Sequence, residues 1–192
     1  MGGEPRKIVA PATTLTDRVT YRYGNTVVEV IHPGVAHTWG DVLVYLPQSK
    51  VLFAGDVSFH HVVPFAHAGQ VTRWLEVVDK IMAMDVDIIV PGHGPIGGKR
   101  ELAEMGDYFR TLKREAKTRF DAGMSAGRAA AEISLGKFDN WIGTERIVLN
   151  TFRLYCEFNG TLTPVLDIPG LRKVVDEYHA ITGLTPPSPP GD

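Results

Sequence analysis

The order of hydrophobic patterns along the 192 residues restricts the fold more than any other feature of this sequence. Short runs rich in strand-forming residues come first, at 19–23, 26–31, 41–46 and 51–54. Gly24 and Asn25 separate the first two runs and form a two-residue signal for a hairpin turn. The first part of the chain is therefore predicted to form neighbouring strands.

Helical periodicity replaces this alternation after residue 70. Apolar side chains recur at helical spacing over 71–82 and 102–120, and a short apolar strand at 87–90 separates these two predicted helices. Three more helices are predicted after Gly123, at about 125–135, 144–158 and 169–183. The predicted order is therefore strands, then a strand between two helices, then helices. This order indicates an α/β fold with helices packed on a sheet.

The same patterns divide the chain into predicted segments. They are a lead-in over 1–18, a β/α unit over 19–122, a helical segment packed on that unit over 123–184, and a proline-rich tail over 185–192. Hydrophobic residues make up 44% and charged residues 22% of the chain, which is ordinary for a soluble globular protein. A chain of this length is therefore able to bury a real core.

Charge and cysteine content restrict the partners and the compartment. The formal net charge is −2 and acidic and basic residues are interspersed, so we expect no binding to nucleic acid or to an anionic membrane. No apolar run approaches the roughly 20 residues that span a bilayer, and the first residues lack the apolar region of a signal peptide. Cys156 is the single cysteine, which fits a reducing compartment. We therefore expect a cytoplasmic protein.

Three glycine-containing segments carry the residues best suited to chemistry. They are AHTWGD with His37, FAGD with Asp56, and VPGHGP with His93. Each is predicted to turn at the end of a strand, where glycine permits a sharp bend, and such loops can converge at one edge of a sheet. A lone histidine there is more often a hydrogen-bonded structural residue. Together, two imidazoles and a carboxylate suit Zn²⁺ or another first-row metal.

The strings HTxGD, LFAGD and VPGHGP resemble the second half of the metallo-beta-lactamase superfamily signature, and the resemblance covers about residues 19–160. It implies that the chain is the C-terminal half of an αββα sandwich, with extra C-terminal helices. It also implies a site for one or two metal ions, usually zinc, with iron or manganese as alternatives. By this resemblance His37 would bind the first metal, Asp56 would bridge both, and His93 would bind the second.

The chain departs from that family in one large respect, because the motif His-x-His-x-Asp-His is absent. In the family this motif supplies three metal ligands and the aspartate that positions the attacking water, so the catalytic residue stays unassigned here. The remaining three ligands are expected to bind metal weakly. Half a sandwich also leaves a sheet face or edge uncovered, so we expect a homodimer or pairing with the missing N-terminal half.

Four other residues are candidates for contact with a small-molecule substrate. Trp39 lies near His37 in the sequence, and three histidines follow Asp56 in a segment that borders the substrate cleft of the family: His60, His61 and His67. The alternative interpretation is packing for the tryptophan and a polar surface loop for the histidines. Asp41 is expected to hydrogen-bond within its own turn rather than to bind metal.

The resemblance implies metal-dependent hydrolysis, in which a metal-activated water attacks an ester, thioester, lactone or amide-like bond. The absent motif favours a different class, a catalytically silent metal-binding or structural domain that assembles with a partner or with itself. Iron-dependent redox chemistry is a third hypothesis, because related proteins use two iron ions, but nothing in the sequence marks a flavin or oxygen site. The sequence does not show which of these bonds, and hence which substrate, a hydrolase of this kind would cleave.

Overall fold

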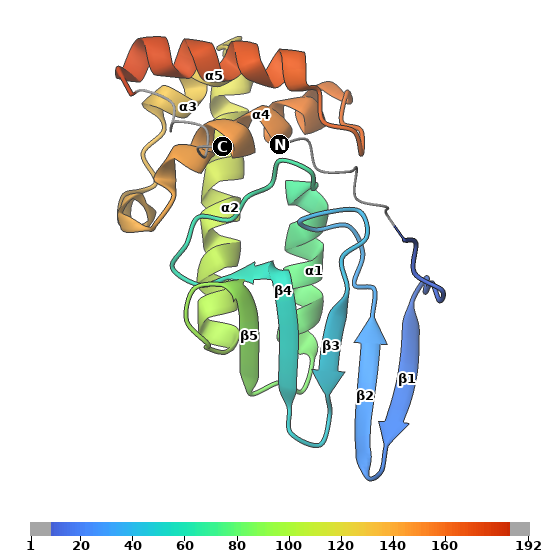
Figure 1. The fold of residues 1–192 in the computed structure, drawn as a ribbon. Helices are drawn as coiled ribbons and strands as arrows, with labels where there is room; N and C mark the ends of the chain where they lie inside the picture. Colours follow the sequence, from blue (N-terminus) through green and yellow to red (C-terminus); the bar gives the residue numbers. More distant parts are fainter. Residues whose placement is uncertain (1–8, 185–192) are drawn as a thin grey trace, which may run out of the picture.

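The computed structural model describes residues 9–184, and its central element is a five-stranded mixed sheet (Figure 1). The strands lie in chain order across the sheet: β1 (Arg18–Tyr23), β2 (Thr26–Ile31), β3 (Leu43–Leu46), β4 (Val51–Phe59) and β5 (Ile88–His93). Neighbours from β1 to β4 are antiparallel, and β5 runs parallel to β4. The predicted α/β class is confirmed. The predicted tail and residues 1–8 of the lead-in lie outside the described residues.

The first hairpin forms where the sequence predicts it. Tyr23 pairs with Thr26 across the two-residue turn, and Gly24 has a φ of +59° there. Glycine adopts this left-handed conformation without the clash that a Cβ would cause. The turn therefore fixes the register of β1 against β2.

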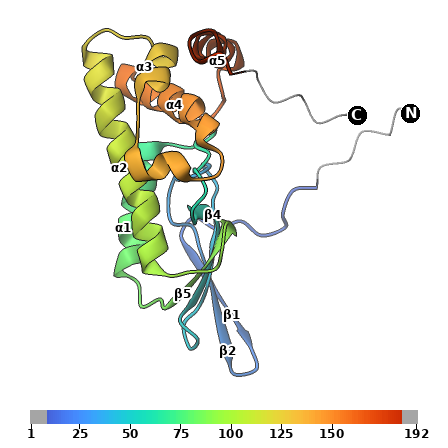
Figure 2. The ribbon, with the colours of Figure 1, turned by 90° about the vertical axis from the view of Figure 1, so that its left-hand side faces the viewer.

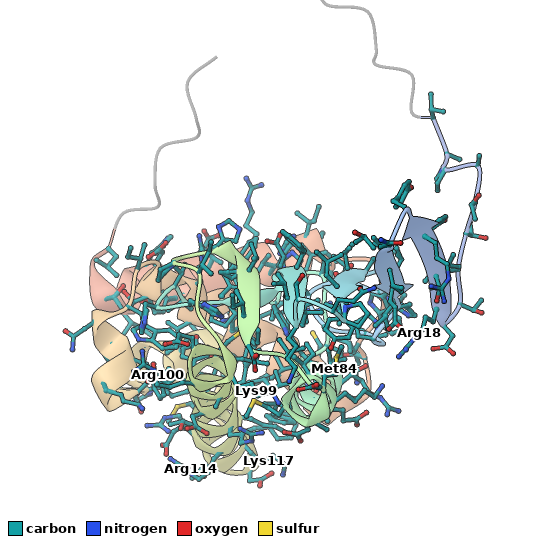
Figure 3. The ribbon with its side chains drawn as sticks, turned by 90° about the horizontal axis from the view of Figure 1, so that it is seen from below. Arg18, Met84, Lys99, Arg100, Arg114 and Lys117 are labelled. Atoms are coloured by element: carbon teal, nitrogen blue, oxygen red, sulfur yellow. The ribbon has the colours of Figure 1, made fainter. Side chains whose placement is uncertain are left out.

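Two helices cover one face of the sheet (Figure 2). α1 (Val71–Ala83) connects β4 to β5, because parallel neighbouring strands need a crossover connection longer than a hairpin turn. α2 (Lys99–Asp121) follows β5. Arg114 and Lys117 lie on the side of α2 away from the sheet (Figure 3). The side facing the sheet contributes to the core, whose fully buried members include Trp74, Ile81, Leu102, Phe109, Leu52 and Ile89.

The opposite face of the sheet carries a continuous apolar row that crosses all five strands. We call it the outer apolar row; its members pair in register from β1 to β5 as Val19, Val30, Val44, Phe53 and Val90. Phe53 is 44% exposed, whereas its strand neighbours Leu52 and Ala54 are buried against the helices. Within residues 9–184, no helix lies over this row (Figure 2).

Three further helices stack at the top of the sheet (Figure 1). They are α3 (Ala126–Glu132), α4 (Ile147–Asn159) and α5 (Ile168–Thr182), with short 3₁₀ turns at Gly136–Asn140 and Thr144–Arg146. α3 ends three residues before its predicted end, α4 begins three residues after its predicted start, and α5 is displaced by one residue. Ser125 precedes α3 as predicted, but its hydroxyl donates to Glu177 of α5 instead of capping the helix. Every helix in the described part of the chain is too short or too polar to cross a membrane.

Trp74 is the side chain that joins α1, α2 and the candidate site, so its removal tests the packing. Its ring is fully buried, contacts Phe109 at a centroid distance of 4.9 Å, and its Nε1 donates to the carbonyl of Val57 at 2.9 Å. We expect Trp74→Ala to lower the free energy of unfolding by about 3–5 kcal/mol in chemical denaturation, because it leaves a cavity and an unpaired carbonyl.

Tyr23→Ala is the matched control, because Tyr23 is 69% exposed and should change the stability by less than about 0.5 kcal/mol. Equal losses for the two variants would contradict this description of the core.

Candidate functional site

His37 lies in the connection between β2 and β3, and a small hydrogen-bond network fixes this loop. The Asp41 carboxylate accepts from the Thr38 amide at 2.9 Å and from the Thr38 hydroxyl at 2.6 Å. His32 Nδ1 donates to the Asp41 carbonyl at 2.8 Å, because a carbonyl oxygen can only accept. Asp41 therefore has the structural role within its turn that the sequence predicted, and the loop holds His37 at the sheet edge.

Asp56 lies inside β4 rather than in a turn after it. Gly55 has a φ of +51°, and the pairing of β4 with β5 shifts register on both sides of it. This irregularity lets the strand bend and continue to Phe59. Asp56 consequently faces Gly92 of β5 so closely that a Cβ at position 92 would lie 2.0 Å from Asp56 Oδ1.

The three side chains selected from the sequence meet at the Asp56 carboxylate. His37 Nε2 lies 3.6 Å from Oδ2, and His93 Nε2 lies 3.3 Å from Oδ1. Each carboxylate oxygen thus faces a different imidazole. However, no group of three or more His, Cys, Asp or Glu side chains within residues 9–184 has an arrangement that could hold one metal ion. The described residues bring the three side chains together without forming a complete site.

The two imidazoles have different surroundings. The His37 side chain is 13% exposed and its ring lies edge-on to Trp74, with centroids 5.6 Å apart. His37 Nδ1 is buried and has no hydrogen-bond partner among the described residues, which is costly for a polar atom unless a ligand or water satisfies it. The His93 side chain is 49% exposed and stacks on Phe59 at 4.7 Å. The site therefore has a buried side at His37 and an open side at His93.

Three of the four expected cleft residues remain accessible to some degree. Trp39 is 40% exposed, and the His61 side chain is 49% exposed with its Nδ1 3.9 Å from Glu104 Oε2. His67 stacks on Phe65 with centroids 3.9 Å apart and lies edge-on to His37 at 5.8 Å. Burial lowers the pKa of His67 below its ordinary value, which favours a neutral ring. Substrate contact by these residues remains a prediction.

His60 is a correction to the prediction for this segment. Its residue is completely buried, its Nδ1 lies 2.8 Å from the Pro95 carbonyl, and its Nε2 lies 2.8 Å from the Ser58 hydroxyl. Because both ring nitrogens have protein partners, the ring has no free edge for a substrate. Burial also lowers the pKa of His60 below its ordinary value. The sequence interpretation failed because it ended the strand at 54, whereas β4 reaches Phe59.

Sequence reasoning did not identify Phe59 or Gly92 as parts of this site. Phe59 contacts both imidazole rings, with centroids 6.0 Å from His37 and 4.7 Å from His93. Its apolar character inside a strand gave no signal beyond packing. Gly92 stands next to His93 in the motif, and the need for a missing Cβ becomes visible only when β4 and β5 are paired.

Comparison with known proteins points to one family. Residues 22–93 match the model of the metallo-beta-lactamase superfamily. A protein named metallo-beta-lactamase type 2 from Bacillus sp. (strain 170) is 30% identical over 106 residues, which are 52% of this chain and 41% of that protein. A linear primary-alkylsulfatase from Pseudomonas sp. (strain ATCC 19151) is 28% identical over 105 residues, 50% of this chain and 20% of that protein.

Solved structures agree with this similarity. A metallo-beta-lactamase from Pontibacter korlensis aligns with a TM-score of 0.50 and 26% identity, covering 53% of this chain and 50% of the other. The sec-alkylsulfatase Pisa1 from Pseudomonas sp. aligns with a TM-score of 0.63 and 20% identity, covering 81% of this chain and 28% of the other. The second likeness concerns the fold alone. This chain spans less than half the length of the two curated relatives named above.

The close approach of Gly92 to Asp56 predicts a specific mutational effect. Gly92→Ala should displace the Asp56 carboxylate and lower the free energy of unfolding by about 1–3 kcal/mol, because the new methyl group overlaps Oδ1. Amide chemical shifts in β4 and β5 should move with it. Gly40→Ala is the control, since no atom lies within 4 Å of its added Cβ. Indistinguishable stability and spectra for the two variants would contradict the close approach.

Proposed function

This chain contains a partial metallo-beta-lactamase superfamily domain, and we propose that it provides part of the metal centre of a metal-dependent hydrolase. The observation that carries the proposal is the Asp56 carboxylate between the imidazoles of His37 and His93, at 3.6 and 3.3 Å. The bond cleaved in this proposal is an ester, thioester, lactone or amide-like bond of a small molecule. The relatives named as a beta-lactamase and an alkylsulfatase support hydrolysis as the reaction class.

The donor set fits zinc, with iron or manganese as alternatives. Two imidazole nitrogens and a carboxylate are common zinc ligands, and the Nε2 atoms of His37 and His93 both face the Asp56 carboxylate. Because the two imidazoles face different carboxylate oxygens, we propose that His37, Asp56 and His93 would together hold the metal, with Asp56 shared between the two histidines. Additional ligands must come from elsewhere, since no described group of three is arranged around one ion.

The chain's own residues would perform distinct tasks in this centre. When bound, a divalent metal supplies Lewis-acid activation of water and polarisation of the scissile bond. Trp74 and Phe59 exclude water from the buried side of His37, with ring centroids 5.6 and 6.0 Å from the imidazole. The half-exposed His93 leaves the other side open to substrate. In this proposal Trp39, His61 and His67 line the approach. A cytoplasmic location, in keeping with the single cysteine, is part of the same proposal.

The incomplete ligand set favours a second candidate function. A domain with these three side chains and no further ligand would bind metal weakly or hold a structural ion without catalysis. The two functions differ in whether further metal ligands reach the open side of the site, at His93.

We also propose that the outer apolar row packs against a second β-sheet that carries the remaining metal ligands. Stacked sheets bury their apolar faces about 10 Å apart, and the row presents five aligned side chains with Phe53 44% exposed. The curated lactamase relative is more than twice as long as the part matched here, because the alignment covers 41% of it. A sheet with further ligands would complete both the core and the site.

Zinc binding tests the proposed centre directly. In competition with a chromophoric chelator, the purified chain should bind zinc weakly, and Asp56→Ala and His93→Ala should each weaken binding by at least about 10-fold. The matched controls are Asp176→Ala and His179→Ala on α5, which should bind as the wild type does. Absence of zinc binding by the wild type, or equal binding by all variants, would refute the metal centre.

The partner proposal is tested with a polypeptide encoded by DNA adjacent to the coding sequence of this chain. A polypeptide that contains His-x-His-x-Asp-His, co-expressed with this chain, should form a complex with it in native mass spectrometry. Phe53→Lys should weaken that complex by at least about 10-fold, because it places a charge in an apolar interface. Ile181→Lys on α5 is the control, since Ile181 is 50% exposed and lies outside the row. A homodimer lost in Phe53→Lys, or a stable monomer that binds no such segment, would overturn the proposed occupant.

A further inference from the structure

His60 is a buried histidine that the proposed chemistry does not use. It follows β4 directly and is completely buried, yet it makes polar contacts through its main chain and both ring nitrogens. Its amide donates to the His93 carbonyl at 2.9 Å, and its ring lies 2.8 Å from the Pro95 carbonyl. Both contacts reach the end of β5 and the turn that follows it, residues 93–97, which we call the His93 loop.

We propose that His60 is a positioning residue that fixes the His93 loop and thereby the place of the His93 imidazole beside Asp56. The inference rests on the proposed function, since it assigns His60 a role in organising that metal centre. It replaces the expectation that His60 contacts the substrate.

The hydrogen-bond partners determine the protonation of the ring. The Pro95 carbonyl can only accept, so His60 Nδ1 must carry the proton and donate at 2.8 Å. Because complete burial disfavours a charged ring, His60 Nε2 keeps its lone pair and accepts from the Ser58 hydroxyl at 2.8 Å. Ser58 is also completely buried. The ring is therefore a neutral Nδ1–H imidazole with both nitrogens satisfied, which holds it in one orientation.

The chain packs closely on the other side of this contact. Gly94 has a φ of +92°, and a Cβ added there would lie 1.9 Å from the His60 carbonyl oxygen. The residue before His60 adds a second restraint, because the Phe59 ring stacks on the His93 ring with an interplanar angle of 16°. Phe59 and His60 thus hold the ring and the backbone of His93 at the same time.

A similar arrangement holds the other histidine loop. His32 Nδ1 donates to the Asp41 carbonyl at 2.8 Å, four residues after His37, as His60 Nδ1 donates to Pro95, two residues after His93. In both loops a histidine outside the candidate ligand set fixes the main chain beyond a candidate ligand. Loss of either bond should loosen the corresponding loop, and partners of this kind typically change metal affinity by about 10–100-fold.

Two substitutions separate positioning from general packing. In His60→Asn the side-chain amide nitrogen lies near the former Nδ1 and can still donate to Pro95. His60→Leu introduces an apolar side chain of similar bulk and removes the Nδ1–H donor. His179→Leu on α5 is the control, because His179 lies outside the site and its loop contacts.

Amide hydrogen exchange of the metal-free proteins gives a readout that does not depend on zinc. Exchange over 93–97 should be at least about 10-fold faster in His60→Leu, and close to wild type in His60→Asn and His179→Leu. Zinc affinity, measured in chelator competition, should fall by about 10–100-fold in His60→Leu and by less than about 3-fold in His60→Asn. Unchanged exchange in a folded His60→Leu would overturn the inference.

The wild-type protein offers an independent test if His60→Leu does not fold. Nitrogen NMR of ¹⁵N-histidine-labelled protein should identify His60 as the neutral Nδ1–H form, a result that packing alone does not require. An Nε2–H form would overturn the inference. If no variant binds zinc but the exchange and tautomer results agree, the proposed function fails while the role of His60 in fixing the loop stands.

Discussion

The candidate site depends on how closely β4 and β5 approach each other at Asp56 and Gly92. A Cβ on residue 92 would lie 2.0 Å from Asp56 Oδ1, so the absence of a side chain at this position makes room for the carboxylate. The left-handed conformation of Gly55 lets β4 bend where its register with β5 shifts. Gly92 thus leaves room for the carboxylate between two imidazoles that come from distant parts of the chain.

The packing of the helices gives the site its two different sides. α1 places Trp74 against His37 on the buried side of the site. On the open side, the His93 side chain is 49% exposed. The face of the sheet opposite α1 and α2 carries the outer apolar row and has no covering helix within residues 9–184 (Figure 2). An incomplete ligand set and an uncovered apolar face thus occur in one molecule. A second sheet that carries metal ligands would account for both.

Local patterns in the sequence predicted much of the fold and which site residues would meet. Strand alternation, the Gly24-Asn25 turn and the helical period over 71–82 each depend on a few neighbouring residues, and each has its counterpart in the structure. The three motifs indicated that His37, Asp56 and His93 lie close together, although Asp56 stands inside β4 and not in the predicted turn. The burial of His60 did not, because it results from Pro95 and Ser58 approaching the ring after β4 and β5 pair. Contacts of this kind have no periodic signal.

X-ray absorption at the zinc edge tests the central claim most directly, because it identifies the atoms bound to the metal. The zinc-loaded chain should show imidazole nitrogen and carboxylate oxygen at about 2.0–2.1 Å, and the imidazole signal should decrease in His93→Ala. A spectrum dominated by a thiolate at about 2.3 Å, with Cys156 as its source, or one without imidazole, would contradict a metal centre at Asp56.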